Sequence, residues 1–395
     1  MLEAASHKPT HSWTVKVLLL VALGMLVFNC PSGLCENGAP SRGNAVTADF
    51  VPANAAGTNA APPDTTSTNA APTTAASTDA APTNAAPTNA ARGPVPLQAV
   101  HPTGDITGAI LFRNHIRKYS VHVPPSYKGG DSWPIVMCFH GGGGDIGFAR
   151  RMFRLNEKAD KEHFLVCYPN GSGRLRDHVL TWNAIECCGY AKSHNIDDVA
   201  FCRTLLARLS RDYEIDQQRV YLLGFSNGAM FAYLLAAVMP EKFAALAIVS
   251  GSMCGKEPQP SAPVSCLIIH GTADKHIPIE GGPGKLAKWG FNVHAQPLSY
   301  PVSFWVRADG CNPTPQIVRN KEVECKTFSS GKDGSEVILY TIDGYAHSWP
   351  GGNRAWLFAD TPYPSLSATD VCWDFFARHH RQIASPASKD NDASR

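Results

Sequence analysis

One short stretch of this chain, Gly224-Phe225-Ser226-Asn227-Gly228, constrains the fold more than any other feature. The apolar run 220–223 before it is typical of a buried strand, and the run 229–239 after it is typical of a helix. A G-x-S-x-G pentapeptide in this position indicates a sharp turn that exposes the serine hydroxyl at the carboxyl end of a parallel sheet. The outer glycines are needed there because a Cβ would collide with neighbouring strands. The alternative is a glycine-rich turn with an idle serine.

Short apolar runs alternate with helical patterns over the rest of the chain. Continuous apolar runs are typical of parallel strands that are buried on both faces. We expect strands at 119–123, 135–139, 164–168, 220–223, 244–249, 264–269 and 337–342. We expect helices at 148–163, after an Asn195 cap, at 229–239, and from the capping box Ser367-x-x-Asp370 through Phe376. The alternation predicts an α/β fold with a mainly parallel sheet and helices on both faces.

The N-terminal region has the pattern of an export signal. Lys16 precedes the apolar run 17–28, which has the length of a signal-peptide core and is too short to span a membrane. We therefore predict a signal peptide at 1–38, a secreted or periplasmic protein, and no stable membrane span after processing. Cys30 leaves a lipid-anchored form as the alternative.

Composition divides the remainder into three parts. Residues 39–93 repeat Ala, Thr, Asn and Pro with almost no large apolar side chains, which predicts a disordered linker. The folded domain is expected over 94–380, and a polar, flexible tail over 381–395.

Charge and cysteine content exclude several classes of protein. The formal net charge is +2, with basic and acidic residues evenly mixed, which argues against a nucleic-acid partner. No Cys-x-x-Cys pair is present, so we expect no structural zinc, no other metal and no cofactor. Several of the 12 cysteines of an exported chain should form disulfides. We predict that Cys311 pairs with Cys325, and that at least one of the adjacent Cys187 and Cys188 has a partner elsewhere.

A serine hydroxyl needs an adjacent base before it can act as a nucleophile at neutral pH. In chains with this turn, a carboxylate and then a histidine follow the serine. Asp274 and His347 each come directly after a predicted strand, in that order. We predict Ser226, Asp274 and His347 as a catalytic triad. Glu280 is the alternative acid, and His270 is expected to brace the Asp274 loop.

A second glycine-rich segment, His140-Gly141-Gly142-Gly143-Gly144, follows the predicted strand 135–139. Such a loop donates backbone N–H groups to the oxyanion that forms when a carbonyl carbon is attacked. We predict an oxyanion hole from the N–H groups of Gly141, Gly142 and Asn227. A phosphate cradle is the alternative, but the chain lacks the Gly-Lys-Ser/Thr ending and the G-x-G-x-x-G pattern of such loops.

Together these motifs resemble the polyhydroxybutyrate depolymerase and feruloyl esterase family of secreted α/β-hydrolases, which is related to the acetylxylan esterases. The likeness runs from about Tyr119 to Phe376. Beside the two glycine-rich segments, it is carried by Thr181-Trp182-Asn183, Cys187-Cys188-Gly189, Asp197-Asp198-Val199-Ala200-Phe201, His270-Gly271-Thr272-Ala273-Asp274, Asp309-Gly310-Cys311 and His347-Ser348-Trp349-Pro350-Gly351. The resemblance implies the same triad, in a serine esterase that works through a covalent acyl-enzyme.

The connection between two predicted strands bears on the substrate. Lipases insert a lid domain at this point, whereas only the loop 250–263 joins the strands here. Without a large lid, the serine should lie in an open groove that suits polymeric or bulky esters, such as polyhydroxyalkanoates, esterified plant polysaccharides or phenolic esters. Trp182, Trp289 and Trp349 are the predicted substrate contacts, with the core as the alternative for the first two. Alternative functions are an acetylxylan esterase, a serine peptidase of the same fold, and a non-catalytic binding protein on a hydrolase scaffold.

Overall fold

The computed structural model describes residues 102–285, 294–354 and 359–382. The predicted signal peptide and linker lie outside these residues, as do Trp289 and residues 383–395 of the predicted tail. Among the helices in the described ranges, none combines the length and the apolar character that crossing a membrane requires.

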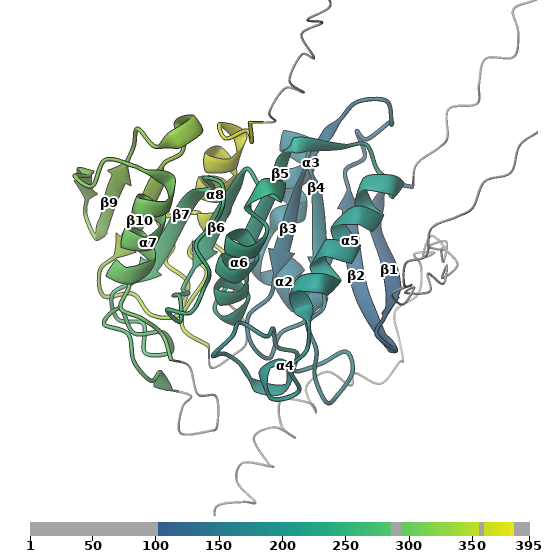
Figure 1. The fold of residues 1–395 in the computed structure, drawn as a ribbon, viewed down its shortest axis with the longest axis horizontal. Helices are drawn as coiled ribbons and strands as arrows, with labels where there is room; N and C mark the ends of the chain where they lie inside the picture. The colour runs from purple at the N-terminus through teal and green to yellow at the C-terminus, as the bar shows by residue number, and fades with distance from the viewer. Residues whose placement is uncertain (1–101, 286–293, 355–358, 383–395) are drawn as a thin grey trace, which may run out of the picture. The chain divides into compact units, whose positions relative to one another are not determined.

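A ten-stranded sheet with the order β1-β2-β4-β3-β5-β6-β7-β10-β9-β8 forms the centre of the described part (Figure 1). Its strands are β1 (Gly104–Phe112), β2 (His115–Val123), β3 (Trp133–Phe139), β4 (Leu165–Pro169), β5 (Ile215–Phe225), β6 (Ala245–Val249), β7 (Ser265–Gly271), β8 (Gln316–Asn320), β9 (Val323–Phe328) and β10 (Val337–Ile342). The strands from β4 to β10 in this order run parallel. Antiparallel hairpins, β1–β2 and β9–β8, extend the two edges. The predicted parallel sheet is confirmed.

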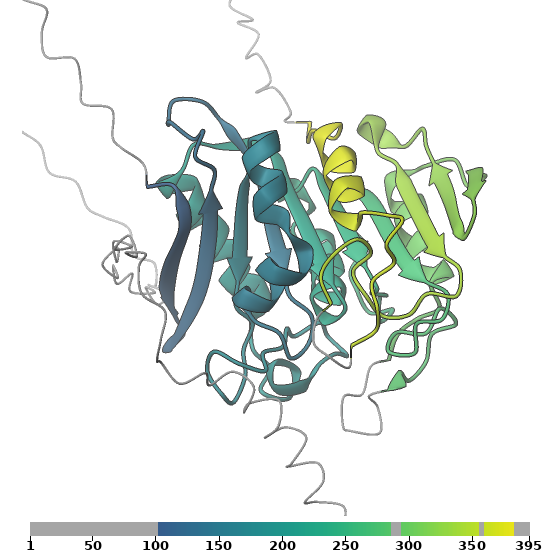
Figure 2. The same cartoon turned by 180° about the vertical axis from the view of Figure 1, so that it is seen from behind.

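Helices cover both faces of the sheet. They are α2 (Ile146–Phe153), α3 (Leu155–Glu162), α4 (Gly189–Ser193), α5 (Asp198–Asp212), α6 (Asn227–Val238), α7 (Ser299–Asp309) and α8 (Ala368–Ala377), with short 3-10 turns at Pro240–Lys242 and Lys332–Gly334. One apolar core joins α5, α6 and α7 to the face seen in Figure 1. A second core joins α2, α3 and α8 to the opposite face, seen in Figure 2.

Two details of the predicted helices are wrong. The single helix expected over 148–163 is two helices, because Arg154 takes a left-handed backbone with φ 55° between α2 and α3. Asn195 does not cap α5; Asp197 does, through a carboxylate that accepts a backbone N–H of the first turn. The predicted cap of the last helix is confirmed, because the Ser367 side chain accepts a backbone N–H at the start of α8.

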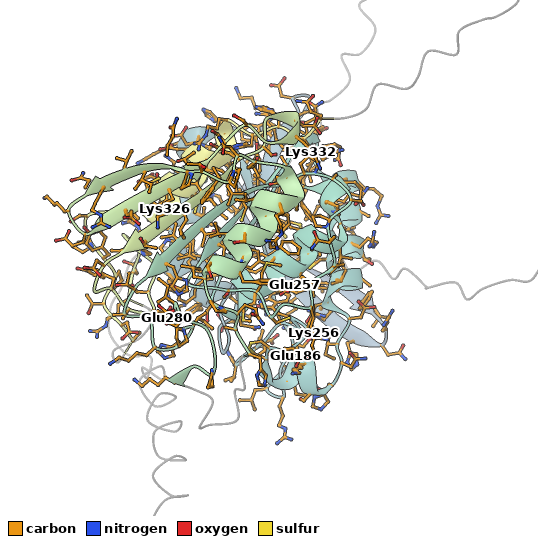
Figure 3. The ribbon with its side chains drawn as sticks, turned by 60° about the vertical axis from the view of Figure 1, so that its left-hand side comes forward. Glu186, Lys256, Glu257, Glu280, Lys326 and Lys332 are labelled. Carbon is orange, nitrogen blue, oxygen red and sulfur yellow. A yellow bond between two sulfur atoms is a disulfide. The ribbon has the colours of Figure 1, made fainter. Side chains whose placement is uncertain are left out.

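The connection between β6 and β7 holds no lid domain. Residues 250–264 are all described, and they contain neither a helix nor a strand. Within this loop, the Glu257 carboxylate accepts the backbone N–H groups of Cys254 and Gly255 at 2.7 and 2.9 Å. Lys256 reaches across to Glu186, in the loop before α4 (Figure 3). The two loops are thereby tied together.

The predicted pairing of Cys311 with Cys325 is wrong. Both thiols are free, and they belong to opposite faces of the sheet. Cys311 lies in the core that contains α7, whereas Cys325 on β9 packs against the core that contains α8. The sulfur atoms of Cys187 and Cys188 instead lie next to each other, and the other cysteines of the described ranges are free.

Candidate active site

Ser226 lies at the tip of the sharp turn between β5 and α6. Its backbone has φ 55° and ψ −122°, which is a strained conformation for a residue with a side chain. A Cβ on Gly228 would collide with the backbone carbonyls of Phe139 and His140, and a Cβ on Gly224 would collide with Gly228. The two glycines thus let α6 begin directly against β3 and β5.

Asp274 and His347 lie in loops that follow two neighbouring strands. β7 and β10 pair in parallel, so both loops leave the same edge of the sheet. The N–H of Ala273 donates to the carbonyl of Tyr345 at 2.8 Å and ties the loops together. A Cβ on Gly271 would collide with that carbonyl, so the glycine permits the close approach.

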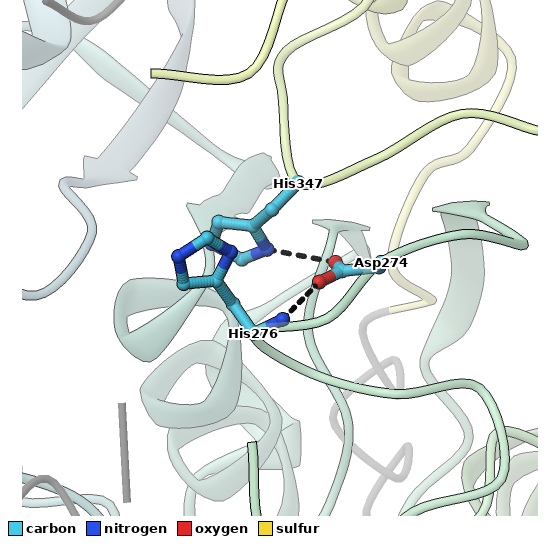
Figure 4. A group of neighbouring side chains, drawn as sticks. All are labelled: Asp274, His276 and His347. Carbon is cyan, nitrogen blue, oxygen red and sulfur yellow. Dashed lines mark hydrogen bonds and ion pairs between the residues drawn. The ribbon is translucent and has the colours of Figure 1, made fainter. Parts of the chain in front are cut away.

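The three predicted triad side chains form one hydrogen-bonded chain. His347 Nε2 is 2.9 Å from Ser226 Oγ, and His347 Nδ1 is 2.7 Å from Asp274 Oδ2. The other oxygen of Asp274 accepts the backbone N–H groups of His276 and Ile277 at 2.8 and 2.9 Å (Figure 4). The carboxylate is therefore fixed by donors on both of its oxygens.

Electrostatics define which proton each group carries. Burial raises the pKa of Asp274, but the charge and the hydrogen bond of His347 outweigh burial, with help from His270 and the N–H of Ile277. The net pKa of Asp274 is below its ordinary value, so the carboxylate is ionised and can only accept hydrogen bonds. His347 Nδ1 must then carry the proton, and Nε2 accepts the Ser226 hydroxyl proton.

The two alternative residues lie differently. Glu280 is exposed and makes no hydrogen bond or ion pair with a residue of the described ranges (Figure 3). His270 is buried, and its Nε2 donates to the carbonyl of Ile277 at 2.8 Å. Burial lowers the pKa of His270, so the ring is neutral beside Asp274. His270 thus braces the Asp274 loop, as predicted.

The glycine loop that follows β3 is positioned by His140. Nε2 of this buried ring accepts the N–H of Gly171 at 3.0 Å, so Nδ1 carries the proton and donates to the carbonyl of Gly141 at 2.8 Å. Burial lowers the pKa of His140 to about 4, which keeps the ring neutral and Nε2 able to accept. The loop lies against the serine turn: a Cβ on Gly141 would be 3.4 Å from Ser226 Cβ, and one on Gly142 would be 3.5 Å from Asn227 Cβ.

Backbone N–H groups of the predicted oxyanion hole are free of competing partners. No group of the described ranges accepts a hydrogen bond from the N–H of Gly141 or Gly142. Asn227 is the first residue of α6, where a backbone N–H has no partner within the helix. The N-terminal end of α6 also carries the positive end of the helix dipole, which favours negative charge.

Trp182 does not contact the cavity beside Ser226, contrary to the prediction. Its ring is fully buried and packs against Phe139 and Phe231, with ring centroids 5.2 Å away in each case. Its Nε1 donates to the carbonyl of His140 at 3.0 Å. Trp182 is therefore a core residue that supports the glycine loop from behind.

A cavity of about 270 Å³ opens beside Ser226. Its apolar wall is formed by Phe148, Met152, Phe225, Met230, Ile277 and Trp349. Trp349, a predicted substrate contact, lines the cavity, and its Nε1 donates a 3.1 Å hydrogen bond to Thr369 Oγ1. The vicinal pair of Cys187 and Cys188 forms another part of the wall.

Two of the polar cavity residues that sequence reasoning missed are His276 and Asp360. His276 comes two residues after Asp274, and this spacing is the signal that could have found it. Asp360 has no such signal, because it lies on a loop between His347 and α8. Its Oδ2 accepts the backbone N–H of His347 at 3.2 Å.

Asp274, His276 and His347 are also residue types that bind metal ions, and their ligand atoms lie within 4.8 Å of one another (Figure 4). Both oxygens of Asp274 already accept hydrogen bonds, however, and both nitrogens of His347 face the other members of the predicted triad. A metal ion would have to displace these bonds, so the arrangement does not favour a resident metal.

The fold has the features of an α/β-hydrolase. The serine turn follows the central strand β5, and the acid and histidine loops follow β7 and β10, in the chain order of that fold.

Comparisons with known proteins find similarity to esterases. Residues 117–274 match the family model described as "Esterase PHB depolymerase". The Nocardia uniformis subsp. tsuyamanensis protein NocK, which is named as an esterase, is 26% identical over 294 residues, or 69% of this chain and 84% of that protein. Feruloyl esterase B of Piromyces equi is 25% identical over 256 residues, or 61% of this chain and 44% of that protein.

The chain thus spans less than half the length of the Piromyces equi protein. A solved structure, the acetyl xylan esterase from Aspergillus awamori, is 17% identical and has a TM-score of 0.42, with 66% of this chain and 94% of that chain covered.

Proposed function

We propose that this protein is a serine carboxylic-ester hydrolase that works through a covalent acyl-enzyme. Ser226 Oγ attacks the ester carbonyl carbon while His347 Nε2 takes the hydroxyl proton. The alcohol leaves with that proton, and a water molecule activated by His347 then releases the acid. Asp274 holds His347 in the tautomer that the reaction needs. The observation that carries the proposal is the chain of 2.9 and 2.7 Å contacts that ends on the strained serine turn.

The oxyanion of the tetrahedral intermediate is assigned to the N–H groups of Asn227, Gly141 and Gly142. Backbone hydrogen bonds among the described residues leave these N–H groups free, and the glycine loop lies against Ser226 and Asn227. Preorganised donors of this kind supply a large share of the rate in acyl transfer, about 10²- to 10³-fold for each one.

Polymeric or bulky esters are the proposed substrates. The mostly apolar cavity suits an apolar acyl group, and the short β6–β7 loop leaves the region beside it without a lid domain. The family name and the feruloyl and acetyl xylan esterases among the similar proteins favour polyhydroxyalkanoates, phenolic esters and acetylated polysaccharides as the compounds to test.

Export is proposed from the N-terminal sequence. The apolar run after Lys16 has the length and the basic flank of a signal peptide, and the repetitive segment 39–93 suits a spacer outside the cytoplasm. Expression with and without residues 1–38, followed by fractionation, tests this part: only the full chain should leave the cytoplasm.

The central experiment labels the purified protein with a fluorophosphonate. One label per chain, located at Ser226 by mass spectrometry and absent from Ser226→Ala, is the expected result. Hydrolysis of a short chromogenic ester should fall with Ser226→Ala by about 10⁴-fold or more. An Ser226→Ala enzyme that keeps its activity would overturn the proposal.

Substrate comparison then separates the alternatives. Initial rates on 3-hydroxybutyrate oligomers, methyl ferulate and acetylated xylan distinguish the three ester classes. Cleavage of a matched anilide or peptide faster than the esters would indicate a peptidase. A protein that binds these compounds without turnover or labelling would indicate a binding scaffold.

A further inference from the structure

His276 lies against the predicted general base. Its ring centroid is 4.7 Å from that of His347, and the two rings are tilted by 36° (Figure 4). Its backbone N–H donates a hydrogen bond to Asp274, which fixes the position of the His276 backbone. A Cβ on Gly284 would collide with the carbonyl of His276, so the chain at Gly284 lies directly against the His276 backbone. The ring is thus held over His347 at the cavity wall.

The two ring nitrogens of His276 lie in different surroundings. Nδ1 is buried, has no hydrogen-bond partner, and lies 3.7 Å from Asp360 Oδ2. The side chain is 25% exposed, so its exposed part is the opposite edge, which carries Nε2. No residue of the described ranges forms a hydrogen bond with Nε2, and His276 is one of the residues that line the cavity.

Charges around His276 determine its protonation. The groups that face it are His347, Asp274, Asp360 and Lys285. Burial and the neighbouring His347 lower the pKa of His276, and the carboxylates of Asp274 and Asp360 offset only part of this effect. The neutral ring places its single proton on Nδ1, where the Asp360 carboxylate attracts it. Nε2 is then a hydrogen-bond acceptor without a partner among the described residues.

The position of Nε2 places this acceptor beside the alcohol half of an ester substrate. His347 Nε2 must reach the leaving oxygen of the alcohol in order to protonate it. A ring that lies on His347 is therefore next to the carbon atoms that carry this oxygen. The apolar wall of the cavity, which contains Met152 and Trp349, suits an apolar acyl group instead.

We propose that His276, oriented by Asp360, is a specificity-determining residue for the alcohol half of the ester, where its Nε2 accepts a hydrogen bond from a hydroxyl group beside the leaving oxygen. The favoured alcohol therefore carries a hydroxyl group on the carbon next to the one that is bonded to the leaving oxygen. This inference rests on the proposed function, because it needs the triad to define the leaving-group side.

Two butyrate esters of equal size test the proposal: 2-hydroxypropyl butyrate and isobutyl butyrate, which differ by a hydroxyl in place of a methyl group. We expect a kcat/KM about 3- to 10-fold higher for the hydroxylated ester, the effect of one hydrogen bond. His276→Phe keeps a ring beside His347 but has no acceptor, and the ratio should fall to about 1. Asp360→Asn keeps an oxygen for the N–H of His347 and should lower the ratio less.

Fluorophosphonate labelling of the same His276→Phe preparation separates this inference from the proposed function. A variant that labels at Ser226 and still prefers the hydroxylated ester overturns the role of His276. If kcat/KM for both esters and the labelling rate fall by one common factor, the proposal is also overturned. His276 would then only position His347, without contacting the alcohol. Activity that survives Ser226→Ala would instead overturn the proposed function itself.

Discussion

The side chain of Asn227 is bonded to the backbone of Trp182 through both of its polar atoms. Oδ1 accepts the N–H of Trp182 at 2.8 Å, and Nδ2 donates to its carbonyl at 3.0 Å. The residue whose backbone N–H is assigned to the oxyanion therefore also anchors the loop behind the glycine segment. The Asn227 side chain thus couples the position of the oxyanion donors to the packing of Trp182 in the core.

Asn227→Ala should lower kcat more than it raises KM. The backbone N–H remains, but the loop that supports it loses two buried bonds, so we expect kcat to fall by about 10- to 100-fold, less than the loss of a whole donor. The unpaired groups of Trp182 should also cost about 2 kcal/mol of unfolding free energy. Asn183→Ala, which removes a 2.9 Å bond to the carbonyl of Ile196, is the matched control and should affect stability without this loss of kcat.

The positions of Ser226, Asp274 and His347 could be predicted because local signals place each of them. Each residue follows a continuous apolar strand, and parallel strands that are neighbours bring their carboxyl ends to one edge. The predicted strand 337–342 coincides with β10, and the structure joins its loop to the loop after β7. The apolar pattern of the strands and the order of the three residues along the chain were sufficient to predict their positions.

The rest depends on contacts between distant segments. Whether Trp182 lies in the core or in the cavity is decided by Phe139 and Phe231, which no local pattern connects to it. Sequence spacing likewise placed Cys311 near Cys325, whereas the sheet separates their side chains.

Asp274→Asn should reduce kcat by about 10⁴-fold with little change in KM. An amide in place of the carboxylate can donate to Nδ1 of His347, which favours the tautomer that protonates Nε2 and leaves no acceptor for the Ser226 proton. Stopped-flow measurement of acyl-enzyme formation checks this expectation. A decrease in kcat of less than about 10-fold would mean that another acid, such as Glu280, orients His347.

Stability should fall in acid because of His140. Its pKa is about 4 in the folded protein, against 6.5 for an ordinary histidine, so the unfolded chain binds the proton more readily. The free energy of unfolding therefore keeps its full value above about pH 6.5 and falls by up to about 3 kcal/mol as the pH falls toward 4. Urea unfolding at a series of pH values measures this slope.

His140→Gln removes the titrating group and is the direct comparison for that slope. Its unfolding free energy should be lower than that of the wild type at pH 7.5 but should change less between pH 6.5 and pH 4. Equal slopes for the two proteins would show that other groups cause the acid sensitivity.

Chelators should leave the activity unchanged. The predicted triad needs no metal, and its Asp274 and His347 atoms are occupied by one another. Dialysis against EDTA, with metal analysis before and after, checks this expectation in an ester-hydrolysis assay. Loss of activity that returns with a divalent ion would contradict it.

Substitutions of Trp182 distinguish a core residue from a substrate contact. Trp182→Ala should destabilise the protein by about 3–5 kcal/mol, as loss of a large buried ring does. Trp182→Phe keeps most of the packing and loses only the bond to the His140 carbonyl, so about 1 kcal/mol is expected. Because the ring does not reach the cavity, Trp182→Phe should leave KM unchanged for every ester. A KM that rises while the unfolding free energy stays constant would instead place Trp182 in contact with substrate.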